Sequence, residues 1–148
     1  MNVNLPIYRA KTIKQDYPKH LASEYLQIID GYWYAIGFYD YYKEKENYLG
    51  EFITKHLMLI RRTLNEYFSS TAEEIDPTTL AIHFPDMKDS ENNPIFASLS
   101  EDGKGGDIVG IIDTDFKYTY KYIKAKFMLD NMELLNPYLK FKFIGIQE

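Results

Sequence analysis

The sequence predicts a mainly β protein, in a β-rich α+β fold with one or two short helices. Aromatic residues make up 16% of the 148 residues, and 14 of them are tyrosines. Such rings favour the half-buried, pleated surface of a sheet. Apolar and polar residues alternate along Phe116–Leu129 and Leu139–Ile146, which is the period of a strand with one buried face. Clusters of Asp, Asn, Ser, Pro and Gly separate short apolar runs in the middle of the chain, as turns separate strands.

Length and composition narrow the class of protein. A chain of 148 residues is expected to form one domain spanning 1–148. It has no apolar run approaching the roughly 18 residues of a membrane span, and its first residues do not resemble a signal peptide. Cysteine is absent, which excludes disulfides, cysteine-ligated zinc and thiol catalysis and fits a cytoplasmic protein. The net charge of −5 argues against an affinity for nucleic acid driven by overall charge.

The first third of the chain predicts two strands and a helix. An apolar run over Asn4–Ala10 predicts the first strand. Apolar residues at helical spacing in His20–Asp30, followed by Gly31 where a helix C-cap is favoured, predict a short helix. The aromatic run Tyr32–Tyr42 predicts a strand, and its glycine marks a bulge or a close backbone approach. The charged segment Lys43–Asn47 predicts a turn.

The segment Phe52–Phe68 is ambiguous. Its apolar residues recur at helical spacing. It also contains the continuous apolar run Leu57–Ile60, which is typical of a buried strand. Periodicity alone favours the helix.

The central stretch, Ile75–Val109, predicts a strand, a turn, a second strand and a glycine-rich loop. Two short apolar runs, Leu80–Phe84 and Ile95–Leu99, are separated by turn-forming residues. The loop is Gly103–Asp107. Just before the first run, Asp76-Pro77-Thr78-Thr79 predicts a turn held by side-chain to backbone hydrogen bonds, which would set the angle at which that run enters the core.

Two alternating segments predict strands near the C-terminus. We expect Phe116–Leu129 and Leu139–Ile146 to be antiparallel neighbours joined through Asn131–Pro137. The apolar positions of the first segment change from even to odd numbers near Tyr122–Lys124. Because a one-residue slip moves every side chain to the other face of a strand, a bulge or sharp bend is predicted there.

The central stretch resembles the central motif of the YopX-like proteins, a family found mainly in bacterial phages and prophages. The motif comprises a D-P-x-T turn, a short strand, a D-x-N/S-x-x-x-I-F segment and a closing G-D-I-V. The matching residues are Asp76, Pro77, Thr79, Asp89, Ser90, Ile95, Phe96, Gly106, Asp107, Ile108 and Val109. Segments near both ends resemble the family's opening, second and closing strands. The segment Ala97–Lys104 departs from the commoner pattern, in which I-F runs straight on to G-D-I-V.

This resemblance implies a small barrel-like antiparallel core and a phage or prophage origin, with no established reaction. We expect no cofactor. The family has a strand shortly before the Asp-Pro turn. We therefore predict a strand over Glu51–Arg62, followed by an irregular or helical turn to Ser70.

Two groups of residues are candidate sites. Carboxylates at alternate positions of a strand share a face and are suitable ligands for Mg²⁺. This makes Asp107, Asp113 and Asp115 a candidate metal site, although such residues are more often solvated in turns. Lysines beside tyrosines on a β surface can bind single-stranded nucleic acid, although they are also ordinary on solvated strand faces. The candidate nucleic-acid-binding lysines are Lys117, Lys121, Lys124, Lys126, Lys140 and Lys142.

The remaining candidates are weaker. The three histidines, His20, His56 and His83, lack the spacing of a local metal pair, and His83 lies among apolar residues like a structural histidine. The loop Gly103–Asp107 lacks the order of a phosphate-binding loop. Its acidic neighbours would also repel phosphate.

The sequence thus favours a cytoplasmic accessory protein without enzymatic activity, acting in a bacterial host cell. We expect it to bind a protein or nucleic-acid partner and no membrane, with a homo-oligomer as one candidate state of the protein. The alternatives are a nucleic-acid-binding small β-barrel and a metal-dependent enzyme.

Overall fold

The computed structural model of the chain describes residues 7–45, 49–64, 67–84, 87–112, 121–130 and 140–148. These residues form a mainly β structure, as predicted. In chain order the elements are β1 (Ile7–Lys11), a 3₁₀ turn (Lys19–Leu21), β2 (Leu26–Ile29), β3 (Tyr32–Lys45), β4 (Phe52–Leu64), β5 (Tyr67–Glu74), a second 3₁₀ turn (Pro77–Thr79), β6 (Ala81–His83), β7 (Ala97–Ser98), β8 (Asp107–Ile112), β9 (Lys121–Lys124), α1 (Ala125–Asp130) and β10 (Lys140–Ile146). None of the described helices is long and apolar enough to cross a membrane.

The chain divides into two compact units. The expectation of one domain over 1–148 stays a prediction. Unit 1 comprises Met1–Arg9 and Thr78–Glu148, and unit 2 comprises Ala10–Pro77. Unit 1 is therefore assembled from both ends of the sequence, whereas unit 2 is one continuous segment. Strand β1 contributes residues to both.

In unit 2, antiparallel pairing joins β2 to β3, β3 to β4 and β4 to β5. The predicted helix over His20–Asp30 is wrong, because β2 occupies Leu26–Ile29 and pairs with β3. Asp30 and Gly31 lie between the two strands with φ of 51° and 86°. Positive φ at both central residues is what a tight hairpin turn requires, and Asp-Gly favours it. Gly31 therefore ends a hairpin turn and does not cap a helix.

The long β3 and β4 strands dominate unit 2. The predicted strand over Tyr32–Tyr42 is confirmed and extends to Lys45, so the turn expected over Lys43–Asn47 is wrong for its first three residues; residues 46–48 lie outside the described part. The strand predicted over Glu51–Arg62 is confirmed. The irregular turn expected after it is wrong, because β5 begins at Tyr67.

The glycine of β3 is a site of close approach, as predicted. A Cβ atom at Gly37 would overlap the carbonyl oxygen of Leu59 and lie 3.3 Å from the Cα of Ile60. The absence of a side chain at Gly37 therefore allows β3 to lie close to the backbone of β4.

In unit 1, β6 pairs with β1 and with β7, and a three-stranded antiparallel sheet has the order β10-β8-β9. The strands at the start and middle of the chain are thus confirmed in part, over Ile7–Ala10, Ala81–His83 and Ala97–Ser98. The expectation that the last two alternating segments are neighbours is wrong. Both segments contribute a strand to one sheet, but β8 lies between those strands.

The change of apolar parity near residues 122–124, where a bulge or sharp bend is predicted, coincides with the change from a strand to a helix. Strand β9 ends at Lys124, and α1 begins at the next residue. Ala125 is fully buried and Leu129 partly buried, as their spacing of four allows on one helix face. The apolar residues after Lys124 therefore belong to a helix.

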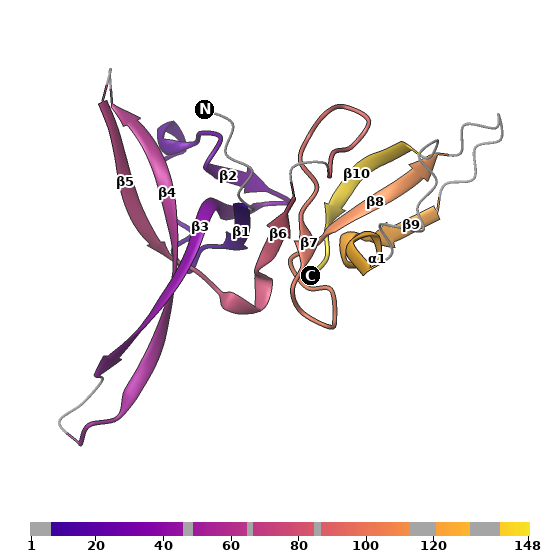
Figure 1. The fold of residues 1–148 in the computed structure, drawn as a ribbon. Helices are drawn as coiled ribbons and strands as arrows, with labels where there is room; N and C mark the ends of the chain where they lie inside the picture. The colour runs from indigo at the N-terminus through magenta and orange to yellow at the C-terminus, as the bar shows by residue number, and fades with distance from the viewer. Residues whose placement is uncertain (1–6, 46–48, 65–66, 85–86, 113–120, 131–139) are drawn as a thin grey trace. The chain divides into compact units, whose positions relative to one another are not determined.

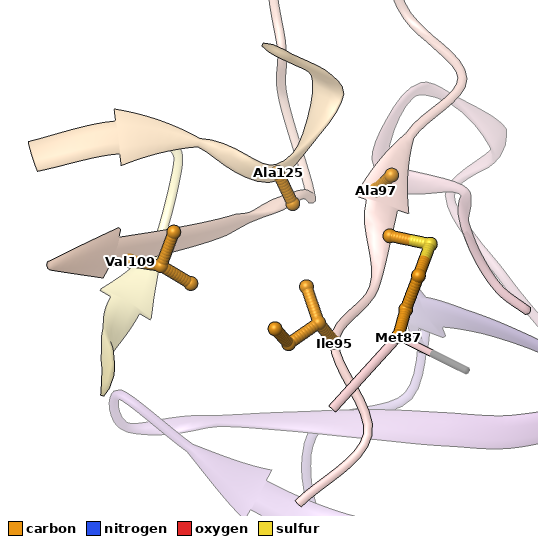
Figure 2. Packing of buried hydrophobic residues seen from close by; sticks show 5 residues of the cluster. All are labelled: Met87, Ile95, Ala97, Val109 and Ala125. Atoms are coloured by element: carbon orange, nitrogen blue, oxygen red, sulfur yellow. The ribbon is translucent and has the colours of Figure 1, made fainter. Parts of the chain in front are cut away.

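The core of unit 1 is a cluster of small and medium-sized apolar side chains. They come from the loop before β7, from β7 itself, from β8 and from α1 (Figure 2), and are Met87, Ile95, Ala97, Val109 and Ala125. Phe84, Leu129 and Phe141 pack against them. Strand β8 and the segment leading into β7 are thus held together by packing as well as by hydrogen bonds.

Every strand pairing between the described residues given above is antiparallel, which establishes the antiparallel, mainly β character. These pairings do not close a sheet into a barrel. The barrel-like core implied by the family resemblance stays a prediction.

Candidate functional site

A buried ion pair in unit 1 joins β1 to the start of β8. Nη2 of Arg9 lies 2.6 Å from Oδ1 of Asp107, and the two side chains are only 4% and 1% exposed. The same nitrogen donates to the carbonyl of Gly105 at 2.9 Å, and the backbone N–H of Phe96 donates to the other carboxylate oxygen at 2.9 Å. Burial raises the pKa of the Asp107 carboxyl, while Arg9 and the Phe96 N–H act in the opposite direction. This carboxylate is therefore bound on both oxygens by the protein itself.

The ring of Phe96 connects this pair to His83. The guanidinium carbon of Arg9 lies 4.5 Å from the ring centroid, within the range of a cation–π contact. On β6, the His83 ring is 5.6 Å from the same centroid, and its Nδ1–H donates to the carbonyl of Ile95 at 3.1 Å. His83 is thus a buried structural histidine, as its apolar neighbours predicted.

His83 should make stability depend on pH. Burial lowers its pKa below the ordinary 6.5, helped by Lys88 and opposed by the Ile95 carbonyl and Asp107. The unfolded chain therefore binds the proton more readily, so this stability contribution is complete above about pH 6.5 and is lost as pH falls through the folded pKa. Between about pH 7.5 and 5 we expect the wild type to lose more thermal stability than His83→Gln. Parallel melting curves for the two proteins over that range would contradict this account.

The residues that resemble the family motif form turns, buried positions and the start of a strand in the described part of the chain. Oδ1 of Asp89 accepts the N–H groups of Glu91 and Asn93 at 2.9 and 2.8 Å, which closes the predicted central turn. Ile95 and Phe96 are buried. Pro77 and Thr79 form the second 3₁₀ turn after Asp76, and Gly106, Asp107, Ile108 and Val109 lead into β8.

The two candidate sites from the sequence are only partly described. Of the possible metal ligands, Asp107 is engaged by Arg9, whereas Asp113 and Asp115 lie outside the described residues. In the part of the chain that is described, no three potential metal-binding side chains come together. The metal site therefore stays an untested prediction.

The candidate lysines are spread over β9, α1 and β10. Lys124 on β9 is exposed and donates from Nζ to the carbonyl of Asp102 at 3.0 Å. Lys142 on β10 is exposed, and Lys126 on α1 is half-buried. Lys121 and Lys140 belong to β9 and β10, and Lys117 lies outside the described residues. The proposal of one basic face from these lysines also stays a prediction.

A second constellation, which the sequence analysis did not identify, lies on the β3–β4 arm of unit 2. We define this arm as Tyr39–Lys45 of β3 with Phe52–Met58 of β4, paired from Tyr39↔Met58 to Lys45↔Phe52. Strand β5 ends at Glu74 opposite Leu57. Most of the arm thus continues beyond the end of β5, as Figure 1 shows.

Strand alternation gives the arm two chemically different faces. Residues directly opposite one another share a face, and successive residues alternate between faces. The first, which we call the aromatic face, carries Tyr39, Tyr41, Lys43, Phe52, Thr54, His56 and Met58. The second, the mixed face, carries Asp40, Tyr42, Glu44, Ile53, Lys55 and Leu57.

Three rings meet on the aromatic face. The Tyr39 and His56 rings are nearly parallel, with an interplanar angle of 5° and centroids 5.9 Å apart. The Tyr41 ring lies 6.2 Å from Tyr39 and 6.3 Å from His56. The Tyr39 hydroxyl is 2.6 Å from Nδ1 of His56, and burial raises the pKa of Tyr39. Tyr41 completes the group while remaining 61% exposed.

Toward the Lys45–Phe52 end of the arm, the aromatic face continues with polar and aromatic residues. Lys43 and Thr54 face each other across the strands and are exposed, and Phe52 is 64% exposed. The arm therefore presents aromatic surface to solvent at two places along one face.

Comparisons with protein-family models, with curated proteins and with solved structures found no match for this chain. The resemblance to YopX-like proteins thus rests on its motif residues alone and stays a prediction.

Proposed function

We propose that this protein is a non-enzymatic accessory protein that binds a macromolecule through the aromatic face of its β3–β4 arm. The observation that carries the proposal is the exposure of Tyr41 and Phe52, at 61% and 64%, on one face of a two-stranded arm. Tyrosine and phenylalanine are enriched in binding interfaces. Aromatic side chains of this size also contribute much of the binding energy where they become buried.

The buried polar groups support an interaction role over catalysis. Arg9, Asp107 and His83 all bond to groups within unit 1. Their contacts hold β1, β6 and β8 to the segment before β7, so these groups have a structural role. The proposal includes the phage or prophage origin, the barrel-like core and the bacterial cytoplasm that the family resemblance implies.

Affinity capture tests this function. Tagged full-length protein, expressed in bacterial cells that carry the phage or prophage, should retain a specific partner. The double variant Tyr41→Ala/Phe52→Ala should lose it, because both exposed rings are gone. The matched control is Tyr42→Ala, which removes a 48% exposed ring from the mixed face and should retain the partner.

The captured material should be examined for both protein and nucleic acid. All three proteins should first show cooperative melting, so that a lost partner reflects the surface and not unfolding. Equal capture by the wild type and the double variant would show that the arm is not the binding site.

A further inference from the structure

We infer that the aromatic face of the β3–β4 arm binds single-stranded nucleic acid by base stacking. This inference rests on the proposed function and names the partner class of the same site. It concerns a surface different from the lysines of β9, α1 and β10. Its grounds are the arrangement of the rings, the confinement of the arm's acidic side chains to the mixed face, and the order of residues along the arm.

The rings have the arrangement that stacking needs. Tyr41 is fixed against Tyr39 and His56 by ring contacts of 6.2 and 6.3 Å, yet most of its surface faces solvent. A base placed on the Tyr41 ring would extend a group of rings that already exists. Because the neighbouring rings restrict Tyr41 beforehand, less side-chain entropy is lost on binding than for a mobile ring.

The acidic side chains of the arm are confined to one face. Asp40 and Glu44 both lie on the mixed face, while the described side chains of the aromatic face include Lys43 and no acid. Glu73 of β5 lies opposite Met58 at the inner end of the face, where it accepts a hydrogen bond from the Tyr17 hydroxyl at 2.6 Å. In a chain of net charge −5, an acid-free face is where a phosphate backbone meets least repulsion.

The order of residues along the face matches a short run of nucleotides. From the inner end outward come the Tyr41–His56 row, the Lys43–Thr54 row and the position of Phe52. Rows on one face repeat about every 7 Å along a strand, so Tyr41 and Phe52 are separated by about 13 Å. Two bases with one nucleotide between them could stack on the two exposed rings, while the intervening backbone passes the ammonium of Lys43 and the hydroxyl of Thr54.

This arrangement favours single strands over duplexes. Paired bases in a duplex are stacked on one another and do not present their faces to a protein side chain. Sequence-tolerant single-strand binders combine ring stacking with positive charge along the phosphate backbone. The modest cationic charge of this face means that stacking supplies most of the affinity, so the dependence on salt should be shallow.

Fluorescence anisotropy with labelled oligodeoxythymidine of about 16 nucleotides tests the inference, because a probe of that length covers one small β surface. At about 50 mM salt the full-length wild type should bind this probe more tightly than a duplex of the same length. Tyr41→Ala should weaken binding about tenfold or more, and Tyr41→Phe should restore it because the ring returns. Lys43→Gln should reduce the slope of log affinity against log salt by about 0.7.

Tyr42→Ala is the matched control and should bind as the wild type does, because its ring belongs to the mixed face. No binding of the probe by the wild type, or equal binding by Tyr41→Ala and Tyr42→Ala, would overturn the inference. If the arm still captured a protein partner in that case, the proposed function would survive and only the nucleic-acid partner would be wrong. If neither probe nor partner depended on the arm, both would be wrong.

Discussion

Replacing Asp107 with alanine is expected to lower the free energy of unfolding by about 3–5 kcal/mol, the usual range when one member of a buried ion pair is removed. Arg9 would keep its charge in a site where only 4% of its side chain meets solvent. The N–H of Phe96 would lose its acceptor as well. Urea titration followed by circular dichroism measures the change.

Two further variants separate the contributions to that loss. Asp107→Asn keeps an oxygen that can accept from the Phe96 N–H but removes the negative charge, so it should recover only the hydrogen-bond part. Arg9→Met combined with Asp107→Leu removes both charges, and it should be more stable than Asp107→Ala because no buried charge is left uncompensated. A loss below about 1 kcal/mol for Asp107→Ala would resemble a surface substitution and would contradict a role for the pair in holding unit 1 together.

Gly105→Ala is expected to be the second severe substitution, through backbone geometry. Gly105 has a φ of 82°, where residues with a Cβ are strained. Its added Cβ would overlap the carbonyl oxygen of Thr79 and lie 2.7 Å from the Thr79 Cα. Since that backbone cannot move as a side chain does, we expect a loss above the roughly 1–2 kcal/mol of left-handed strain alone.

Gly103→Ala is the control for the strain term. Gly103 has a similar φ of 78°, but the nearest atom to an added Cβ is Cδ of Lys124, at 2.6 Å. A flexible lysine can move aside, so this variant should lose little beyond the strain itself. Equal melting temperatures for Gly103→Ala and Gly105→Ala would show that the contact with Thr79 does not matter. Differential scanning calorimetry of both proteins makes the comparison.

The aromatic run of β3 predicts its strand from composition alone. The strand at β4 follows only from the family resemblance, because the periodicity of its apolar residues favours a helix. The helix over His20–Asp30 was wrong because its apolar spacing fits both a helix and an edge strand. The Asp30-Gly31 pair, which favours a tight hairpin turn, was the better signal. At Ala125 the apolar residues continued past the end of β9, and alternation there did not distinguish a bent strand from a following helix.

The sites depended more heavily on pairing between distant residues. No local motif marks Arg9 as the partner of Asp107, because 98 positions separate them. On the arm, alternation along β3 alone places Tyr41 and Lys43 on one face. The positions of Thr54 and His56 require the register with β4, which the sequence does not specify. The sequence therefore indicates only the β3 half of the aromatic face.

The division of the chain also bears on the order in which the protein folds during synthesis. Unit 2 is the continuous segment Ala10–Pro77, so it leaves the ribosome before the synthesis of the Thr78–Glu148 segment of unit 1 is complete. The pairing of β1 with β6 must wait until β6 has been made, and the pairing of Arg9 with Asp107 must wait longer. Contacts so distant in sequence form late, because closing the long loop between them costs chain entropy. The arm in unit 2 is therefore expected to form first, and a nascent chain stalled before Asp107 emerges would already carry the aromatic face.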